Sequence, residues 1–296
     1  MGDLHLRAGA LADGADPVRL TPEQAGWSRS GLRVLRLPAG RVRTVTTDED
    51  EAVVLPLTIT DLTVEVDGVR FDLAGRSSVF ERVTDFVYVG RDSTVTLRAS
   101  SGGEVAVATA RCAERLPARY GPAEAVPIEV RGAGTCTRQV NNFLSPDTWS
   151  HADRLMAVEL LTPGANWSSY PPHRHDASPE CPVNNEEIYY FRVAPQGATP
   201  GFGVHRLYTD DGEIDETVEV RDGDVFLIPR GYHGPSIAAP GHTLYYLNVL
   251  AGPDGARSMA FCDDPAHHWV RESWEGMAPD PRCPMTTATG PVGDRF

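Results

Sequence analysis

Two histidines, His173 and His175, are separated by a single residue in the segment 168–176. Residues two apart in an extended strand point to the same side, so both imidazoles can approach one point. Imidazole is a good ligand for first-row metals such as Zn, Mn, Fe, Co and Ni. The alternative is a pair of exposed or hydrogen-bonded histidines, and this spacing alone does not decide between the two.

Two later segments supply further metal ligands. Residues 186–191 begin with two glutamates and continue as an apolar strand, and residues 222–233 hold an Asp-Gly turn, an apolar strand, a Pro-x-Gly break and a histidine. Three imidazoles and a carboxylate leave open positions on an octahedral ion for a bidentate substrate. The sequence therefore predicts one divalent ion, of undecided identity, held by His173, His175, Glu187 and His233.

The choice among three glutamates rests on strand alternation. Glu187 is followed by strand residues and shares a face with Tyr189, whereas Glu186 points the other way and Glu180 lies in a proline-broken loop. We favour Glu187 as the ligand, with Glu186 and Glu180 as alternatives.

The elements that must position these residues are short strands. Apolar and β-branched runs bounded by turn residues predict an all-β protein with little helix beyond one turn at 22–26. The strands are expected at 57–66, 69–73, 86–89, 94–97, 104–108, 157–161, 187–191, 204–208, 217–220, 225–228 and 244–250. A proline- and glycine-rich stretch at 117–134 divides the chain into two similar β-units, 1–125 and 126–296.

Composition excludes several classes of function. A net charge of -14 argues against nucleic acid and anionic membranes as partners. The chain contains no lysine, which excludes Schiff-base catalysis, lysine-anchored pyridoxal phosphate and a P-loop. The five cysteines are widely spaced, and Cys181 is read as a structural residue in preference to a thiolate ligand. With no apolar leader or membrane span in the sequence, we expect a cytoplasmic protein.

The ligand pattern resembles the two motifs of the cupin superfamily, and the strings around it are similar to the bacterial 5-deoxy-glucuronate isomerase family of myo-inositol catabolism. The strings that carry this resemblance are 167–176, 186–190, 229–233, 245–252 and 264–269, with 78–81 in the N-terminal half. The interval from His175 to Glu187 is longer than in most cupins, but it is a feature of this family. The resemblance implies a bicupin whose N-terminal unit lacks the metal motif.

The resemblance also implies a reaction, the conversion of the aldehyde 5-deoxy-D-glucuronate into the ketone 2-deoxy-5-keto-D-gluconate. A metal would stabilise the enediolate charge, and a general base would move the proton. Candidates for the base are Glu187, Glu186, Tyr190 and His205. Candidates for the arginine that binds the substrate carboxylate are Arg174, Arg192 and Arg138, although each taken singly is also explained as a surface residue. Arg174 lies between the ligands and should face away from them.

Three other functions share the ligand pattern: a ketol isomerase acting on the keto-uronate 4-deoxy-L-threo-5-hexosulose uronate, a cupin dioxygenase with non-haem iron, and a non-catalytic sugar-binding cupin. The strings around residues 186–187 and 231–232 favour the inositol-pathway enzyme. The expected partner is a small anionic sugar acid, and association into a homo-oligomer is left open.

Overall fold

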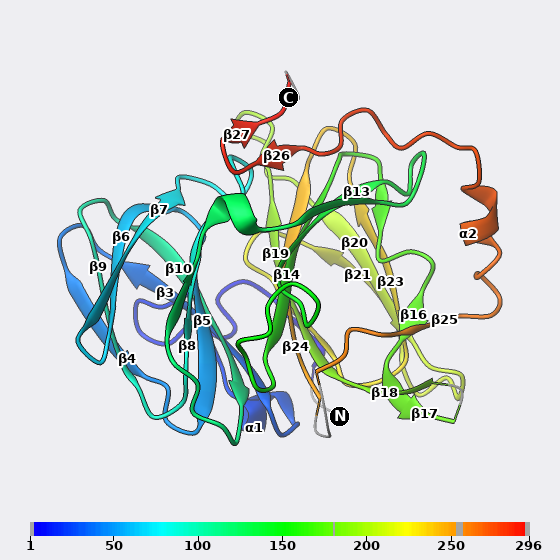
Figure 1. Cartoon of the computed structure of the whole chain (residues 1–296). Coiled ribbons are helices and arrows are strands. Elements are labelled where there is room, and N and C mark those ends of the chain that lie inside the picture. The colour runs from blue at the N-terminus through cyan, green and yellow to red at the C-terminus, as the bar shows by residue number, and fades with distance from the viewer. Residues whose placement is uncertain (1–2, 180, 253–256, 294–296) are drawn as a thin grey trace.

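The computed structural model describes residues 3–179, 181–252 and 257–293, and its regular structure is nearly all β, which confirms the predicted fold class. Figure 1 shows two β-units side by side, with the N-terminal strands in blue and cyan and the later strands in green to orange.

The N-terminal unit is a sandwich of two antiparallel sheets around an apolar core. Its six-stranded sheet has the order β11 (Arg119–Gly121), β8 (Phe86–Val89), β5 (Asp50–Pro56), β10 (Gly103–Arg111), β3 (Ser30–Leu37) and β2 (Val18–Leu20). Its four-stranded sheet has the order β4 (Val42–Thr46), β9 (Thr94–Ala99), β6 (Ile59–Val66) and β7 (Val69–Arg76). The predicted hairpin turn between β6 and β7 is confirmed, since Asp67 and Gly68 take the φ values of 50° and 85° that a two-residue turn of this kind requires.

The C-terminal unit repeats the two-sheet arrangement. Its larger sheet has the order β1 (His5–Leu6), β22 (Val225–Ile228), β19 (Glu186–Val193), β24 (Leu244–Ala251), β14 (Met156–Thr162), β13 (Arg138–Leu144) and β12 (Ile128–Arg131). The facing sheet has the order β21 (Asp215–Val220), β20 (Gly203–Tyr208), β23 (Tyr232–Ala238), β16 (His173–Arg174) and β25 (Cys262–Asp263), and β15 (Trp167–Ser168) also pairs with β23.

The remaining elements are short. Two small hairpins are formed by β17 (Asp176–Ser178) with β18 (Cys181–Asn184) and by β26 (Thr286–Thr287) with β27 (Gly290–Pro291), and the helices are α1 (Pro22–Ala25), the 3-10 turn η1 (Ala123–Ala125) and α2 (Val270–Ser273). The predicted turn at 22–26 is confirmed as α1, which begins with a capping box between Thr21 and Gln24. Within the described residues, every helix is too short to cross a membrane.

The two units are not separate along the chain. The N-terminal strand β1 pairs with β22, with His5 opposite Phe226, so residues of the first half complete the C-terminal sheet. The division of the chain at 125/126 stays a prediction. Strand β1 belongs to the first part of the sequence but to the sheet of the second unit. One apolar cluster runs through both units, from Leu32 and Tyr88 to Ile188 and Tyr245.

Buried charges join the units at this shared core. The guanidinium of Arg76, on β7, forms an ion pair with Glu159 of β14, and both side chains are at most 1% exposed. The hydroxyl of Tyr245 donates a second hydrogen bond to Glu159 at 2.7 Å. Because each group is removed from water, each depends on the other for its solvation.

We predict that Arg76→Met lowers the free energy of unfolding by about 3–5 kcal/mol, since Glu159 would be left as an uncompensated buried charge. Urea denaturation would measure the loss. Arg70→Met, which breaks an exposed pair with Asp72 in the same unit, is the matched control and should not change stability measurably. Equal stability of Arg76→Met and the wild type would contradict this account.

Candidate metal centre and active site

Three side chains converge inside the C-terminal unit. Nε2 of His175 and Nε2 of His233 lie 2.9 Å and 3.0 Å from the same oxygen, Oε2 of Glu187. The ligand atoms of the three residues all lie within 4.8 Å of one another, and all three side chains are buried. Glu187 comes from β19 in one sheet and His233 from β23 in the other, while His175 follows β16, so the site sits between the two sheets.

His173 lies beside this cluster but is not one of the three residues whose ligand atoms lie within 4.8 Å of one another. It pairs with His233 across β16 and β23, and the two imidazole rings are 4.4 Å apart between centroids. Its Nδ1 donates to the carbonyl oxygen of Pro171 at 3.1 Å, which leaves Nε2 as the nitrogen with a free lone pair. His173 as the fourth ligand therefore stays a prediction, with a tautomer that suits the role.

The electrostatics of the cluster favour an ionised Glu187 and a neutral His173. Burial acts to raise the pKa of Glu187, but His233 and His175 outweigh it and hold this pKa well below its usual range. Burial, together with His233, lowers the pKa of His173 well below that of free histidine. The site thus holds an ionised oxygen donor next to an imidazole that stays neutral.

The donor set fits a divalent metal ion. Among the described residues, Nδ1 of His233 has no hydrogen-bond partner and Nε2 has an ion-pair contact with Glu187, although the side chain is fully buried. Buried polar atoms without partners are rare, and a bound ion is one of their ordinary explanations. His175 donates from Nδ1 to the carbonyl of Asn185 at 3.0 Å, the outer contact that orients a histidine with Nε2 toward a metal.

A cavity of about 570 Å³ opens over the cluster and is lined by His173, His175 and Glu187. Tyr189 and Ser169 also line it, with their hydroxyls 3.0 Å apart. The sequence analysis placed Tyr189 on the Glu187 face by strand alternation, a signal that could have suggested a role in the site. This volume is large enough for a small organic ligand.

The structure separates the other predicted acid–base residues from this cavity. The carboxylate of Glu186 faces the N-terminal unit, where it accepts hydrogen bonds from the backbone and hydroxyl groups of Ser28 and Ser30 and from the Arg29 amide. Tyr190 shares that face, with its hydroxyl 3.5 Å from Arg192. Glu180 lies outside the described residues.

His205 belongs to the core of the unit. It is fully buried, hydrogen bonds Ser236 at 2.8 Å, and lies against the rings of Tyr189 and Phe226 without lining the cavity. Burial lowers its pKa to about 3, so it stays neutral. Of the four candidates for the general base, Glu187 lines the cavity and Glu186, Tyr190 and His205 do not, and the identity of the base stays a prediction.

Of the three predicted arginines, one reaches the cavity. Arg174 faces away from the cluster as alternation requires, hydrogen bonding Asp210 and lying over the ring of Tyr232. Arg192 forms ion pairs with Glu104 and Asp222 and does not line the cavity. Arg138 lines the cavity.

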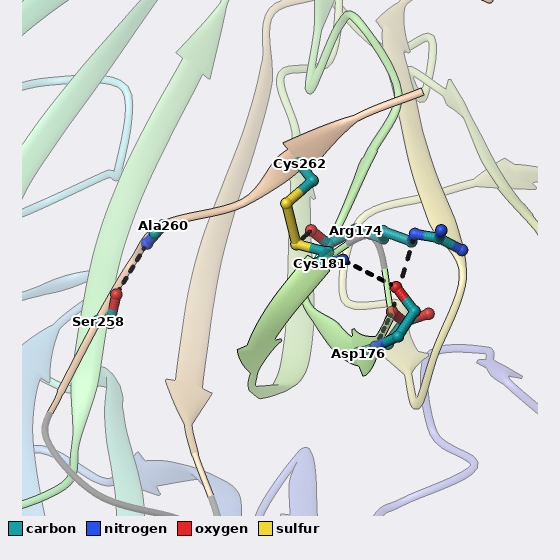
Figure 2. The surroundings of a disulfide bond; sticks show 7 residues. Arg174, Asp176, Cys181, Ser258, Ala260 and Cys262 are labelled. Carbon is teal, nitrogen blue, oxygen red and sulfur yellow. Dashed lines mark hydrogen bonds and ion pairs between the residues drawn. A yellow bond between two sulfur atoms is a disulfide. The ribbon is translucent and has the colours of Figure 1, made fainter. Parts of the chain in front are cut away.

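One wall of the cavity is the segment 257–261, which is fixed at both ends. Arg257 donates to three carbonyls, those of Leu144, Trp149 and Leu155, while Cys262 forms a disulfide with Cys181. Figure 2 shows this bond joining the wall to the β17–β18 hairpin, with Ser258 and Ala260 on the wall and Arg174 and Asp176 beside Cys181. The disulfide excludes Cys181 as a thiolate ligand and was not foreseen from the sequence.

We predict that Glu187→Gln loses the metal while Glu186→Gln keeps it. Replacing a ligand oxygen should lower metal content at least about 10-fold, whereas Glu186 serves the contact between units and its loss should lower thermal stability instead. Elemental analysis of the purified variants, paired with thermal melts, separates the two effects. Normal metal content in Glu187→Gln would show that Glu187 is not a ligand.

Replacing Cys181 and Cys262 together with serine should lower the free energy of unfolding by roughly 2–4 kcal/mol, because the bond closes a long loop in the unfolded chain. Urea denaturation measures this change, and Cys136→Ser, at a free cysteine, is the control. Titration of five reactive thiols in the denatured, unreduced protein would mean that the bond does not form.

Similarity to known proteins supports one family. Residues 5–270 match the model of the KduI/IolB family. A 5-deoxy-glucuronate isomerase of Geobacillus kaustophilus is 43% identical over 261 residues, covering 86% of this chain and 91% of that protein, and one of Bacillus subtilis strain 168 is 38% identical over 244 residues, covering 81% and 87%.

Solved structures extend the likeness to the fold. An IolB-like protein from Salmonella typhimurium LT2 superposes with a TM-score of 0.83 at 32% identity, covering 91% of this chain and 100% of that one. Oxalate decarboxylase from Lactobacillus farciminis, at 10% identity and a TM-score of 0.63 over 86% of this chain and 88% of that one, shares the fold alone. The chain belongs to the KduI/IolB family, and its fold is that of a bicupin.

Proposed function

We propose that this protein is a metal-dependent aldose–ketose isomerase that converts 5-deoxy-D-glucuronate into 2-deoxy-5-keto-D-gluconate in myo-inositol degradation. The observation that carries the proposal is a buried carboxylate–imidazole cluster at the base of a sugar-sized cavity, in a chain whose relatives bear the name 5-deoxy-glucuronate isomerase.

The cluster suits the difficult step of such an isomerisation, the removal of a proton from the carbon beside the aldehyde. A divalent ion held by His175, Glu187 and His233, with His173 as the fourth ligand, would supply the Lewis acidity that makes this proton acidic. Zn, Mn, Fe, Co and Ni all suit these ligands, and we leave the choice open.

Residues around the cluster can hold or move the proton. Among the candidates for the base, Glu187 is the one that lines the cavity, and its carboxylate is ionised. Burial raises the pKa of Tyr189 well above that of free tyrosine, so its hydroxyl stays protonated and can donate a hydrogen bond to a sugar oxygen. Ser169 fixes that hydroxyl through its own hydrogen bonds to Tyr189 and Tyr246.

The expected partner is a small anionic sugar acid, and we propose a cytoplasmic location for the enzyme. The rival functions differ in what they consume: the keto-uronate isomerase takes 4-deoxy-L-threo-5-hexosulose uronate, a dioxygenase takes oxygen, and a sugar-binding cupin converts nothing. Each therefore has its own assay.

Incubation with 5-deoxy-D-glucuronate in deuterated water should give the ketone, with product formation and any solvent deuterium at the reacting carbons followed by NMR. The wild type should turn over this acid faster than the keto-uronate and consume no oxygen. His173→Ala should lower turnover at least about 10-fold if it is a metal ligand. Oxygen uptake, or failure of the wild type to convert the acid, would refute the proposal.

Metal removal is a separate test. Dialysis against a chelator should abolish turnover, because no lysine is present to activate the carbonyl in its place. Adding back one divalent ion at a time should restore activity and identify the preferred metal. Full activity in protein shown by elemental analysis to be metal-free would contradict a metal-dependent mechanism.

A further inference from the structure

Four arginines line the cavity, and three of them are already committed to other groups. Arg131 forms a two-bond pair with Glu129, and Arg271 forms one with Asp263. Arg257 donates hydrogen bonds to three backbone carbonyls. The fourth arginine, Arg138, has neither a carboxylate partner nor a full set of hydrogen bonds among the described residues.

Arg138 is a buried cation that lacks a carboxylate partner within the described part of the chain. Its side chain is 4% exposed and its Nε has no hydrogen-bond partner, while Nη1 donates to the carbonyl of Cys136 at 3.1 Å. A guanidinium has five N–H donors, so most of this fork is not used by the protein. Burial lowers the pKa of Arg138 to about 10, which still leaves it charged at neutral pH.

The local backbone holds this guanidinium in place. Gly132 follows β12 in the turn to β13, with φ of 82°. A Cβ there would lie 2.2 Å from the carbonyl oxygen of Cys136 and 2.8 Å from Nη1 of Arg138. A larger residue would displace both the arginine and the carbonyl that orients it. The position of Arg138 is therefore built into the turn.

Arg138 and the metal cluster lie on one face of the same sheet. The strand order β19, β24, β14, β13 separates Glu187 from Arg138 by three strand spacings across the sheet. The register also places Arg138 at the level of Val193, six residues along the sheet from Glu187, and both side chains line the same cavity. The buried hydroxyl of Tyr246 lies between them, since it hydrogen bonds Ser169, which also hydrogen bonds Tyr189 on the Glu187 face. Burial raises the pKa of Tyr246, and the charge of Arg138 acts to lower it. Between the two ends, Asn248 lines the cavity, and its Nδ2 has no hydrogen-bond partner among the residues that the structure describes.

We propose that Arg138 binds the carboxylate of the substrate, so that the sugar acid lies across the sheet with its aldehyde end at the His175–Glu187–His233 cluster and its acid end at β13. This inference rests on the proposed function and adds the orientation of the substrate and the residue that selects acids over neutral sugars. A charge-assisted pair between arginine and a carboxylate in a buried site is specific for the planar anion.

The test compares acid and neutral ligands in Arg138→Gln, Arg138→Lys and the wild type, with Arg206→Gln, at an exposed arginine of β20, as control. Calorimetry on metal-loaded protein gives Kd for D-glucuronate and D-glucose, which differ in one terminal carboxylate. Steady-state assays give kcat and KM for 5-deoxy-D-glucuronate. Metal content checks that each variant keeps its site.

In the wild type and in Arg206→Gln, D-glucuronate should bind more tightly than D-glucose. Arg138→Gln should weaken D-glucuronate roughly 10- to 100-fold, leave D-glucose unchanged, and raise KM for 5-deoxy-D-glucuronate more than it lowers kcat. Arg138→Lys should recover part of the affinity, because it keeps the charge without the fork.

Equal weakening of both sugars in Arg138→Gln, or no preference for the acid in the wild type, would overturn the role of Arg138. If the wild type prefers D-glucuronate through Arg138 but does not convert 5-deoxy-D-glucuronate, the carboxylate subsite stands and the proposed function fails. The two proposals are thus separable by experiment.

Discussion

The alternation of side chains along β19 is the constraint on which the rest of the structure depends. Two adjacent glutamates point in opposite directions there, Glu186 toward the loop 28–30 of the N-terminal unit and Glu187 toward His175 and His233. Strand β19 therefore contacts the N-terminal unit through the carboxylate of Glu186 and lines the cavity with that of Glu187. A shift of register by one residue would exchange the two roles and destroy both.

The buried acids of this protein fall into two kinds. Glu51, Glu159 and Glu186 are satisfied within the chain, by backbone amides, by Arg76 and by hydroxyls. Glu187 instead faces imidazoles, and one of these, His233, has an Nδ1 without a hydrogen-bond partner in the described residues. Saturated networks stabilise a fold, whereas an unsaturated buried group calls for a ligand. The same contrast distinguishes Arg138 from the paired arginines around it.

The cavity is shaped by chain segments that are far apart in sequence. Its floor comes from β13, β14, β19 and β24, while its wall is the segment 257–261, held by Arg257 and by the Cys181–Cys262 bond. Figure 1 shows these strands packed together in the C-terminal unit. The N-terminal unit contributes support, through Ser28 to Ser30 and Arg76, and its described residues do not line the cavity over the metal cluster.

The sequence by itself determined the all-β class, the β6–β7 hairpin and the candidate ligands, because these depend on local periodicity and on motifs. Strand alternation also set Glu187 apart from Glu186 and turned Arg174 away from the ligands. Only the tertiary structure decided that Tyr190 and Arg192 face the other unit and that Cys181 pairs with Cys262. It also decided that Arg138 has no carboxylate partner among the described residues. Local patterns tell which face of a strand a residue occupies, whereas what covers that face is set by segments distant in the chain.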